Sequence, residues 1–220
     1  IKNAYEKRGY LEIFFGSVFL FLASIAKPSF TLSIVPSIAL VLIFRWSCIK
    51  KINYKYVTIA VVLTSLLVLI SQYIIMYTGE RGDRVIFSPF EAILMYVSDV
   101  PTVLISGFLS IIFPLSISIF SWHKVKHDFS FQLAWTNFFV SLPFAYLLTE
   151  EIDMGSVNFW WTPMIAVFVL FVVTLKFFLE EIVKQKPNVT KGSVKIYLPA
   201  IFLILHIFCG VVYYFSSIFS

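Results

Sequence analysis

The sequence has little charge and few glycines, and it lacks the motifs of nucleotide and hydrolase chemistry. Only 13% of the 220 residues are charged, about half the share of an average soluble domain. The 8 glycines are scattered, and neither G-x-x-x-x-G-K-[ST] nor G-x-G-x-x-G occurs. H-E-x-x-H and the nucleophile elbow G-x-S-x-G are missing as well. These absences argue against nucleotide chemistry in this segment, and we expect no cofactor in it.

Cysteine and histidine are also scarce, with 2 and 3 residues. Cys48 and Cys209 fall at different depths of the apolar runs described below, so we expect no disulfide. His123 and His127 have the i, i+4 spacing of two ligands on one helical face. They flank Lys124 and Lys126, however, and a solvated basic turn is the plainer interpretation. We therefore predict no metal site.

What the sequence has in abundance is apolar residues: 60% are hydrophobic, and the mean hydropathy is +0.91. They form runs of roughly 17 to 24 residues, long enough to cross a hydrocarbon core of ~30 Å as helices. We predict an all-α fold, a single polytopic transmembrane helical bundle over residues 1–220 with about seven spans. The predicted spans are 10–26, 28–44, 56–77, 101–121, 131–148, 160–179 and 196–219.

Residues 10–44 are divided because one helix of that length would reach ~52 Å. Lys27-Pro28 interrupts the run, since the residue before a proline is pushed out of the helical region. Two spans joined by a tight external turn are predicted, and a re-entrant hairpin is the alternative. Pro36, Pro114 and Pro143 are further positions at which spans could kink.

Basic residues fall in alternate gaps between the runs. With the start of the segment in the cytoplasm, all but three of the 17 Lys and Arg lie on the cytoplasmic side, as the positive-inside rule requires. The exceptions are Lys27, Arg81 and Arg84. The net charge of +5 then follows from topology and does not indicate a nucleic-acid partner. We predict a multi-pass protein of a bacterial inner membrane whose C-terminus is extracytoplasmic.

The segment opens at Ile1 with a polar stretch that is typical of a cytoplasmic loop. We expect it to be the C-terminal part of a longer chain.

The longest external gap, residues 78–100, contains Ser88-Pro89-Phe90-Glu91. This is the pattern of a capping box with proline at the first helical position. It predicts a short amphipathic external helix near 89–98 on the outer membrane surface. A loop tucked against the bundle is the alternative.

The three external cations, Lys27, Arg81 and Arg84, are candidates to bind a lipid phosphate at the level of the headgroups. Polar residues predicted at the same membrane face are candidates for the acceptor side, or ion-pair partners of the cations. They are Glu91, Glu150 and Asn158.

Two segments carry a resemblance to a known family. Ser24-Ile-Ala-Lys27-Pro28-Ser29-Phe30, followed by Pro36, resembles a hairpin of polytopic GT-C type membrane glycosyltransferases. The acidic turn from Glu150 through Asn158-Phe159-Trp160 is similar to a late loop of bacterial members. The resemblance implies transfer of a hexose or pentose from a polyprenyl-phosphate carrier at the extracytoplasmic face, with cations gripping the carrier phosphate. Its partners would be membrane lipids and this lipid-linked sugar donor.

The catalytic acid of such enzymes lies in an early external loop, which is expected upstream of residue 1, so no catalytic residue is assigned. The alternatives are a lipid or oligosaccharide flippase, a transporter or a channel-like scaffold. A polysaccharide polymerase or ligase would need a larger external loop. Buried ionisable residues, which ion-coupled transporters use, are nearly absent from the predicted spans.

Overall fold

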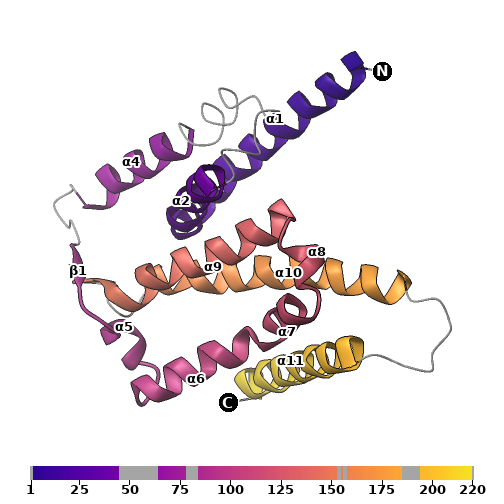
Figure 1. Cartoon of the computed structure of the whole chain (residues 1–220). Coiled ribbons are helices and arrows are strands. Elements are labelled where there is room, and N and C mark those ends of the chain that lie inside the picture. The colour runs from indigo at the N-terminus through magenta and orange to yellow at the C-terminus, as the bar shows by residue number, and fades with distance from the viewer. Residues whose placement is uncertain are drawn as a thin grey trace. The chain divides into compact units, whose positions relative to one another are not determined.

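The computed structural model describes residues 2–44, 64–77, 84–152, 155, 158–184 and 194–219. These residues are mostly helical (Figure 1), as predicted. In chain order the helices and strands are α1 (Lys2–Ala26), α2 (Pro28–Phe44), α4 (Thr64–Tyr77), β1 (Val85–Phe87), α5 (Glu91–Leu94), α6 (Val100–Ser110), α7 (Ile112–Phe120), α8 (Trp122–Val125), α9 (Phe129–Leu147), β2 (Leu148–Glu150), the 3₁₀ turn η4 (Asn158–Trp160), α10 (Trp161–Lys184) and α11 (Val194–Phe219).

Among the described residues, two helical stretches are long and apolar enough to cross a membrane, Asn158–Val183 and Val194–Phe215. A third candidate is the bent pair α6 and α7. The fold is therefore that of a helical membrane protein, but the described residues do not support seven spans. The apolar parts of the first hairpin, Phe14–Ala26 and Pro28–Phe44, are short. Residues 56–63 of the third predicted span lie outside the described residues.

The fifth predicted span, 131–148, forms helix α9 but is not a candidate span by length and composition. Four polar side chains within residues 131–148 lower the hydropathy of this segment. They are Gln132, Thr136, Asn137 and Ser141.

The division of the first apolar stretch at Lys27 is confirmed. Helix α1 ends at Ala26 and α2 begins at Pro28, where a proline is favoured because its missing N–H is not needed. The backbone N–H of Lys27 donates to the Ala23 carbonyl (2.8 Å), and that of Phe30 donates to the Lys27 carbonyl (3.2 Å). Helix α1 starts well before the predicted position 10, because helix formation does not require the apolar side chains that a span does.

The fourth predicted span, 101–121, is not one helix. Helices α6 and α7 meet at Ile111 with a bend of 49°. Pro114 explains the break, since it has no N–H to offer the Ser110 carbonyl four residues earlier, and its ring would clash with that carbonyl. By contrast, α2 and α9 continue through Pro36 and Pro143.

The predicted amphipathic helix near 89–98 is wrong in extent. Only Glu91–Leu94 are helical, and Phe90 before them has a left-handed backbone with φ 64°. The N–H groups of Ser88 and Phe90 donate instead to the carbonyls of Leu147 and Tyr146 at the end of α9. These bonds fix the backbone that the capping box would have used to start a helix at Pro89.

A short antiparallel pair of strands was not predicted. β1 lies beside β2 at the end of α9 (Figure 1), with Val85 opposite Glu150 and Phe87 opposite Leu148. The N–H of Glu151 extends the pairing by donating to the Arg84 carbonyl (2.9 Å).

The described chain divides into two compact units. The first comprises residues 1–96 and 136–166, and the second comprises 97–135 and 167–220. In the second unit the core centres on Phe113, Ile117 and Phe178, where α7, α10 and α11 pack. The first unit contains the hairpin of α1 and α2, and it holds the candidate site.

Candidate functional site

The first unit contains a cavity of about 700 Å³. Its wall is built from the hairpin turn, α4, β1, the end of α9, β2 and η4. Most of the lining is aliphatic or aromatic, and the residues that contribute it include Ile25, Leu32, Leu69, Ile70, Phe144 and Leu148. A few polar side chains interrupt this lining, an arrangement typical of a ligand site.

Lys27 lines the cavity from the turn between α1 and α2. The side chain is half-buried, and its Nζ lies 4.8 Å from the centre of the Trp161 ring. A cation over an indole face is attracted by the ring quadrupole. The turn fixes the backbone of Lys27 and Trp161 contacts its side chain, so the ammonium group is held at the cavity.

Glu150 and Asn158 form the second polar group of the wall. Glu150 is only 5% exposed, and its Oε2 accepts a hydrogen bond of 2.8 Å from Nδ2 of Asn158. Directly opposed residues of antiparallel strands project to the same face, and Val85, which pairs with Glu150, lines the same cavity. The strand pair therefore turns a carboxylate into the cavity, and η4 brings the amide that holds it.

Hydroxyl groups tie the hairpin together. Ser24 Oγ donates to the Leu20 carbonyl (2.7 Å) and lies 2.6 Å from Thr31 Oγ1, with both side chains fully buried. Because a hydroxyl has one proton, Thr31 is the donor in this pair. This hydrogen bond joins α1 to α2 next to the turn that contains Lys27.

A second hydroxyl joins the hairpin to α10. Thr162 Oγ1 donates to the Ser29 carbonyl (3.2 Å) in a buried position. Ser29 also lines the cavity, and its own Oγ is buried without a hydrogen-bond partner among the described residues. An unsatisfied buried hydroxyl is costly, which makes Ser29 a candidate to bond a ligand.

Three of the predicted site residues, Lys27, Glu150 and Asn158, line this one cavity. Arg84 and Glu91 are exposed and do not line it. The hydroxyl of Ser88 donates to Glu91 Oε2, so the predicted acceptor-side role of Glu91 has no support from the cavity. Arg81 lies outside the described residues.

Sequence reasoning missed Ser29 and Tyr73 in the lining of this cavity, and it missed Trp161 as the ring that contacts Lys27. A signal was present for the first of them, because hydroxyl residues recur through the apolar hairpin. These are Ser24, Ser29, Thr31, Ser33 and Ser37, all buried. Tyr73 and Trp161 carry no such local signal, since they come from distant α4 and α10.

Within the described ranges, no group of three His, Cys, Asp or Glu side chains could hold a metal ion. The chain matches no protein-family model, no curated protein and no solved structure. The candidate site is therefore argued from its geometry alone.

Proposed function

We propose that this chain binds a polyprenyl-phosphate-linked sugar in the cavity of its first unit and forms part of a membrane glycosyltransferase. One observation carries the proposal: a single cavity joins a long apolar wall to Lys27 and to the Glu150–Asn158 pair. An amphiphile with a hydrocarbon tail and an anionic, hydroxyl-bearing head has the matching chemistry.

In this proposal Lys27 binds the carrier phosphate as a point charge. Transfer breaks the bond between the anomeric carbon and the phosphate oxygen, and the acceptor oxygen forms a new bond to that carbon while its proton passes to the catalytic carboxylate that the resemblance implies. Negative charge accumulates on the departing phosphate, so Lys27 stabilises the transition state more than the bound substrate. Glu150 accepts hydrogen bonds from hydroxyl groups of the sugar or the acceptor, and Asn158 donates hydrogen bonds to them.

We also propose how the chain crosses the membrane and which face carries the cavity. Seven crossings with the N-terminal end of the segment in the cytoplasm would place Lys27, Arg84 and Glu150 on the extracytoplasmic face of a bacterial inner membrane. Arg81 and Arg84 would then add positive charge near the same face. The hairpin of α1 and α2 would cross as two short, upright spans.

The test uses the full-length protein in vesicles that contain a polyprenyl phosphate sugar. We expect Lys27→Ala to lower carrier binding and transfer at least about tenfold, because a charge-assisted contact contributes about 1.5–3 kcal/mol. Lys27→Arg retains the charge and should recover part of the activity. Lys126→Ala removes a cation that does not line the cavity and serves as the matched control. Unchanged turnover of Lys27→Ala at both limiting and saturating carrier would refute the assignment.

A flippase or transporter is the second candidate, favoured by the broken helix at Ile111. Transporters use discontinuous helices around their substrate sites. The two functions separate in one assay: a flippase moves the intact carrier across the vesicle membrane, whereas a transferase consumes it only when an acceptor is supplied.

A further inference from the structure

A second cavity, of about 190 Å³, lies in the other unit, among the ends of α7, α10 and α11. Its polar lining is Ser121, His123, Lys124, Glu181 and Lys195. The volume is about six times the ~30 Å³ share of one water molecule in the liquid. It is too small for a whole lipid or drug-sized ligand, but it has room for a compact headgroup.

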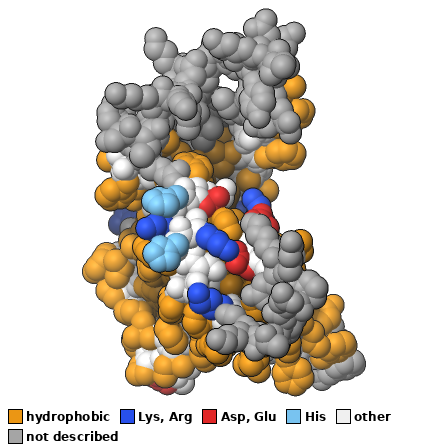
Figure 2. All heavy atoms as spheres, turned by 45° about the vertical axis from the view of Figure 1, so that its right-hand side comes forward, with side chains coloured by type: hydrophobic (Ala, Val, Ile, Leu, Met, Phe, Trp, Pro, Cys, Tyr) orange, Lys and Arg blue, Asp and Glu red, His pale blue; other side chains and the backbone are white. Residues whose placement is uncertain are grey.

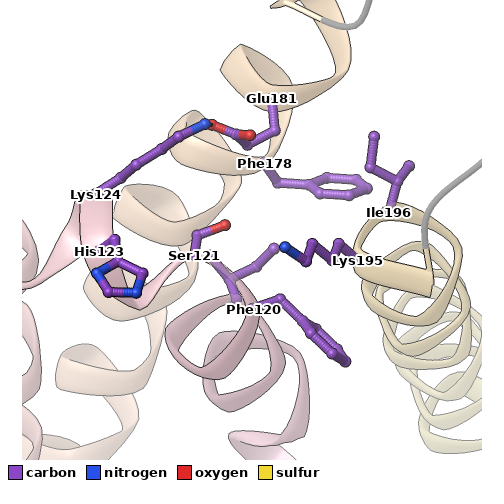
Figure 3. Close-up of a pocket in the computed structure, with 9 residues that line it drawn as sticks. Phe120, Ser121, His123, Lys124, Phe178, Glu181, Lys195 and Ile196 are labelled. Atoms are coloured by element: carbon purple, nitrogen blue, oxygen red, sulfur yellow. The ribbon is translucent and has the colours of Figure 1, made fainter.

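The charges of this cavity favour an anion. Two lysines oppose one carboxylate, that of Glu181, which forms an ion pair with Lys124. Lys195 extends from α11 toward Ser121 (Figure 3). Ser121 makes no side-chain hydrogen bond that would cap α8, within the described chain. The ammonium group of α11 and a hydroxyl from the junction of α7 and α8 therefore converge.

The start of α11 adds to this preference. Lys195 and Ile196 lie in the first turn of a 26-residue helix, where backbone N–H groups lack partners within the helix and the helix dipole is positive. Lys195 thus brings its own charge to a helix end that already attracts anions.

The surroundings of the cavity point to a lipid. Apolar side chains Ile117, Phe120, Phe178 and Ile196 complete its lining. Candidate spans start or end beside it, since Lys195 is the second residue of Val194–Phe215 and Glu181 is near the end of Asn158–Val183. Figure 2 shows Lys, His and acidic side chains gathered together, with hydrophobic side chains around them. The cavity therefore lies beside the ends of two candidate spans, where the headgroup layer of a bilayer would be.

We infer that this cavity binds the phosphate headgroup of an anionic phospholipid, with Lys195, Ser121 and Lys124 as its polar contacts. The sequence places these residues on the cytoplasmic side, and the cytoplasmic leaflet carries the negative surface charge that attracts juxtamembrane lysines. The acyl chains would lie along the exposed apolar surface of α11, which includes Ile201, Ile204 and Phe208.

Scattered lysines at a cytoplasmic boundary would also follow from topology alone. Lys126 provides the comparison, because it belongs to the same basic turn but does not line the cavity. Diffuse attraction to an anionic surface requires Lys126 as much as Lys195. Binding of a headgroup in the cavity requires Lys195, whereas the carboxylate of Glu181 repels the phosphate.

The experiment compares full-length protein in vesicles of phosphatidylcholine with and without phosphatidylglycerol, and counts the retained lipid by native mass spectrometry. We expect selective retention of phosphatidylglycerol and an affinity about fivefold weaker for Lys195→Gln. Glu181→Gln should strengthen retention, because it frees Lys124. Lys126→Gln should match the wild type.

The proposal is overturned if phosphatidylglycerol is not preferred, if Lys126→Gln weakens retention as much as Lys195→Gln, or if Glu181→Gln lowers it. A misfolded variant cannot imitate the expected gain in Glu181→Gln. Inorganic phosphate in phosphatidylcholine vesicles separates the two sources of the anion. Equal stabilisation of the protein by inorganic phosphate and by the lipid would make this a free-phosphate site and would also overturn the proposal.

Discussion

The side-chain amide of Asn158 donates a 2.8 Å hydrogen bond to the nearly buried carboxylate of Glu150. This bond joins the end of β2 to the turn that starts α10, and both residues line the cavity that also contains Lys27. The two ends of the acidic loop, Glu150 and Asn158, are therefore parts of the cavity wall.

Replacing Asn158 with Leu should destabilise the protein by about 1–3 kcal/mol, because the nearly buried carboxylate of Glu150 loses the hydrogen bond that Asn158 donates. Thermal unfolding in detergent measures the loss. Combining Asn158→Leu with Glu150→Gln should give a coupling energy of about 0.5–3 kcal/mol, as for residues in contact. The exposed neighbour Glu151 offers the control, and Glu151→Gln should stay within about 0.5 kcal/mol of the wild type. Purely additive effects of the first two changes would contradict the assigned bond.

Thr31→Val should loosen the hairpin of α1 and α2. The change keeps the shape of the side chain and removes the proton that Thr31 donates to Ser24, for an expected loss of about 0.6–2 kcal/mol, the range for interhelical hydrogen bonds in membranes. Ser71→Ala is the matched control, since Ser71 bonds to the Leu67 carbonyl of its own helix on an exposed face. An equal loss in both variants would show that the Ser24–Thr31 bond does not stabilise the helix pair.

Asp99 should make the stability of the α6 start depend on pH. Its carboxylate accepts hydrogen bonds from the backbone N–H of Thr102, the hydroxyl of Ser98 and the hydroxyl of Thr102, and these bonds lower its pKa below the ordinary value. The folded state thus favours the charged form. The contribution is complete above the unfolded pKa of about 3.9 and is lost as the pH falls through the lower, folded pKa.

Unfolding of the wild type and of Asp99→Asn, compared from neutral to acidic pH, checks this assignment. Asparagine can cap the helix but does not titrate, so the stability difference between the two proteins should shrink as the pH falls. A difference that stays constant through the acidic range would show that the charge of Asp99 has no part in the cap.

Structural features that depend on residues adjacent in the sequence could be predicted. The break at Lys27-Pro28 follows from the sterics of the residue before proline, and α2 spans the predicted 28–44. Local signals failed where distant groups competed for the same backbone. The sequence Ser88-Pro89-Phe90-Glu91 matches the capping-box pattern of a helix start. The N–H groups of Phe90 and Ser88 nevertheless donate to the carbonyls of Tyr146 and Leu147.

Three of the residues that line the cavity, Lys27, Glu150 and Asn158, could be singled out from the sequence, but the way they come together could not. Charge asymmetry singled out Lys27, and the acidic turn singled out Glu150 and Asn158, because such residues are rare in an apolar chain. Nothing local indicated that Val85–Phe87 would pair with Leu148–Glu150, since three-residue strands are too short to carry a pattern. Exclusion of Arg84 and Glu91 from the cavity lining follows from that pairing and from the fold of the chain around it.

Pairing of β1 with β2 orders the steps by which the site can be made during synthesis. The hairpin that carries Lys27 is synthesised before the opposite wall, which contains Glu150 and Asn158. Residues 97–135 of the other unit emerge between them. The complete lining therefore forms only after the helices of residues 97–135 have been made, so a ligand that contacts both walls can bind only once β2 has paired with β1.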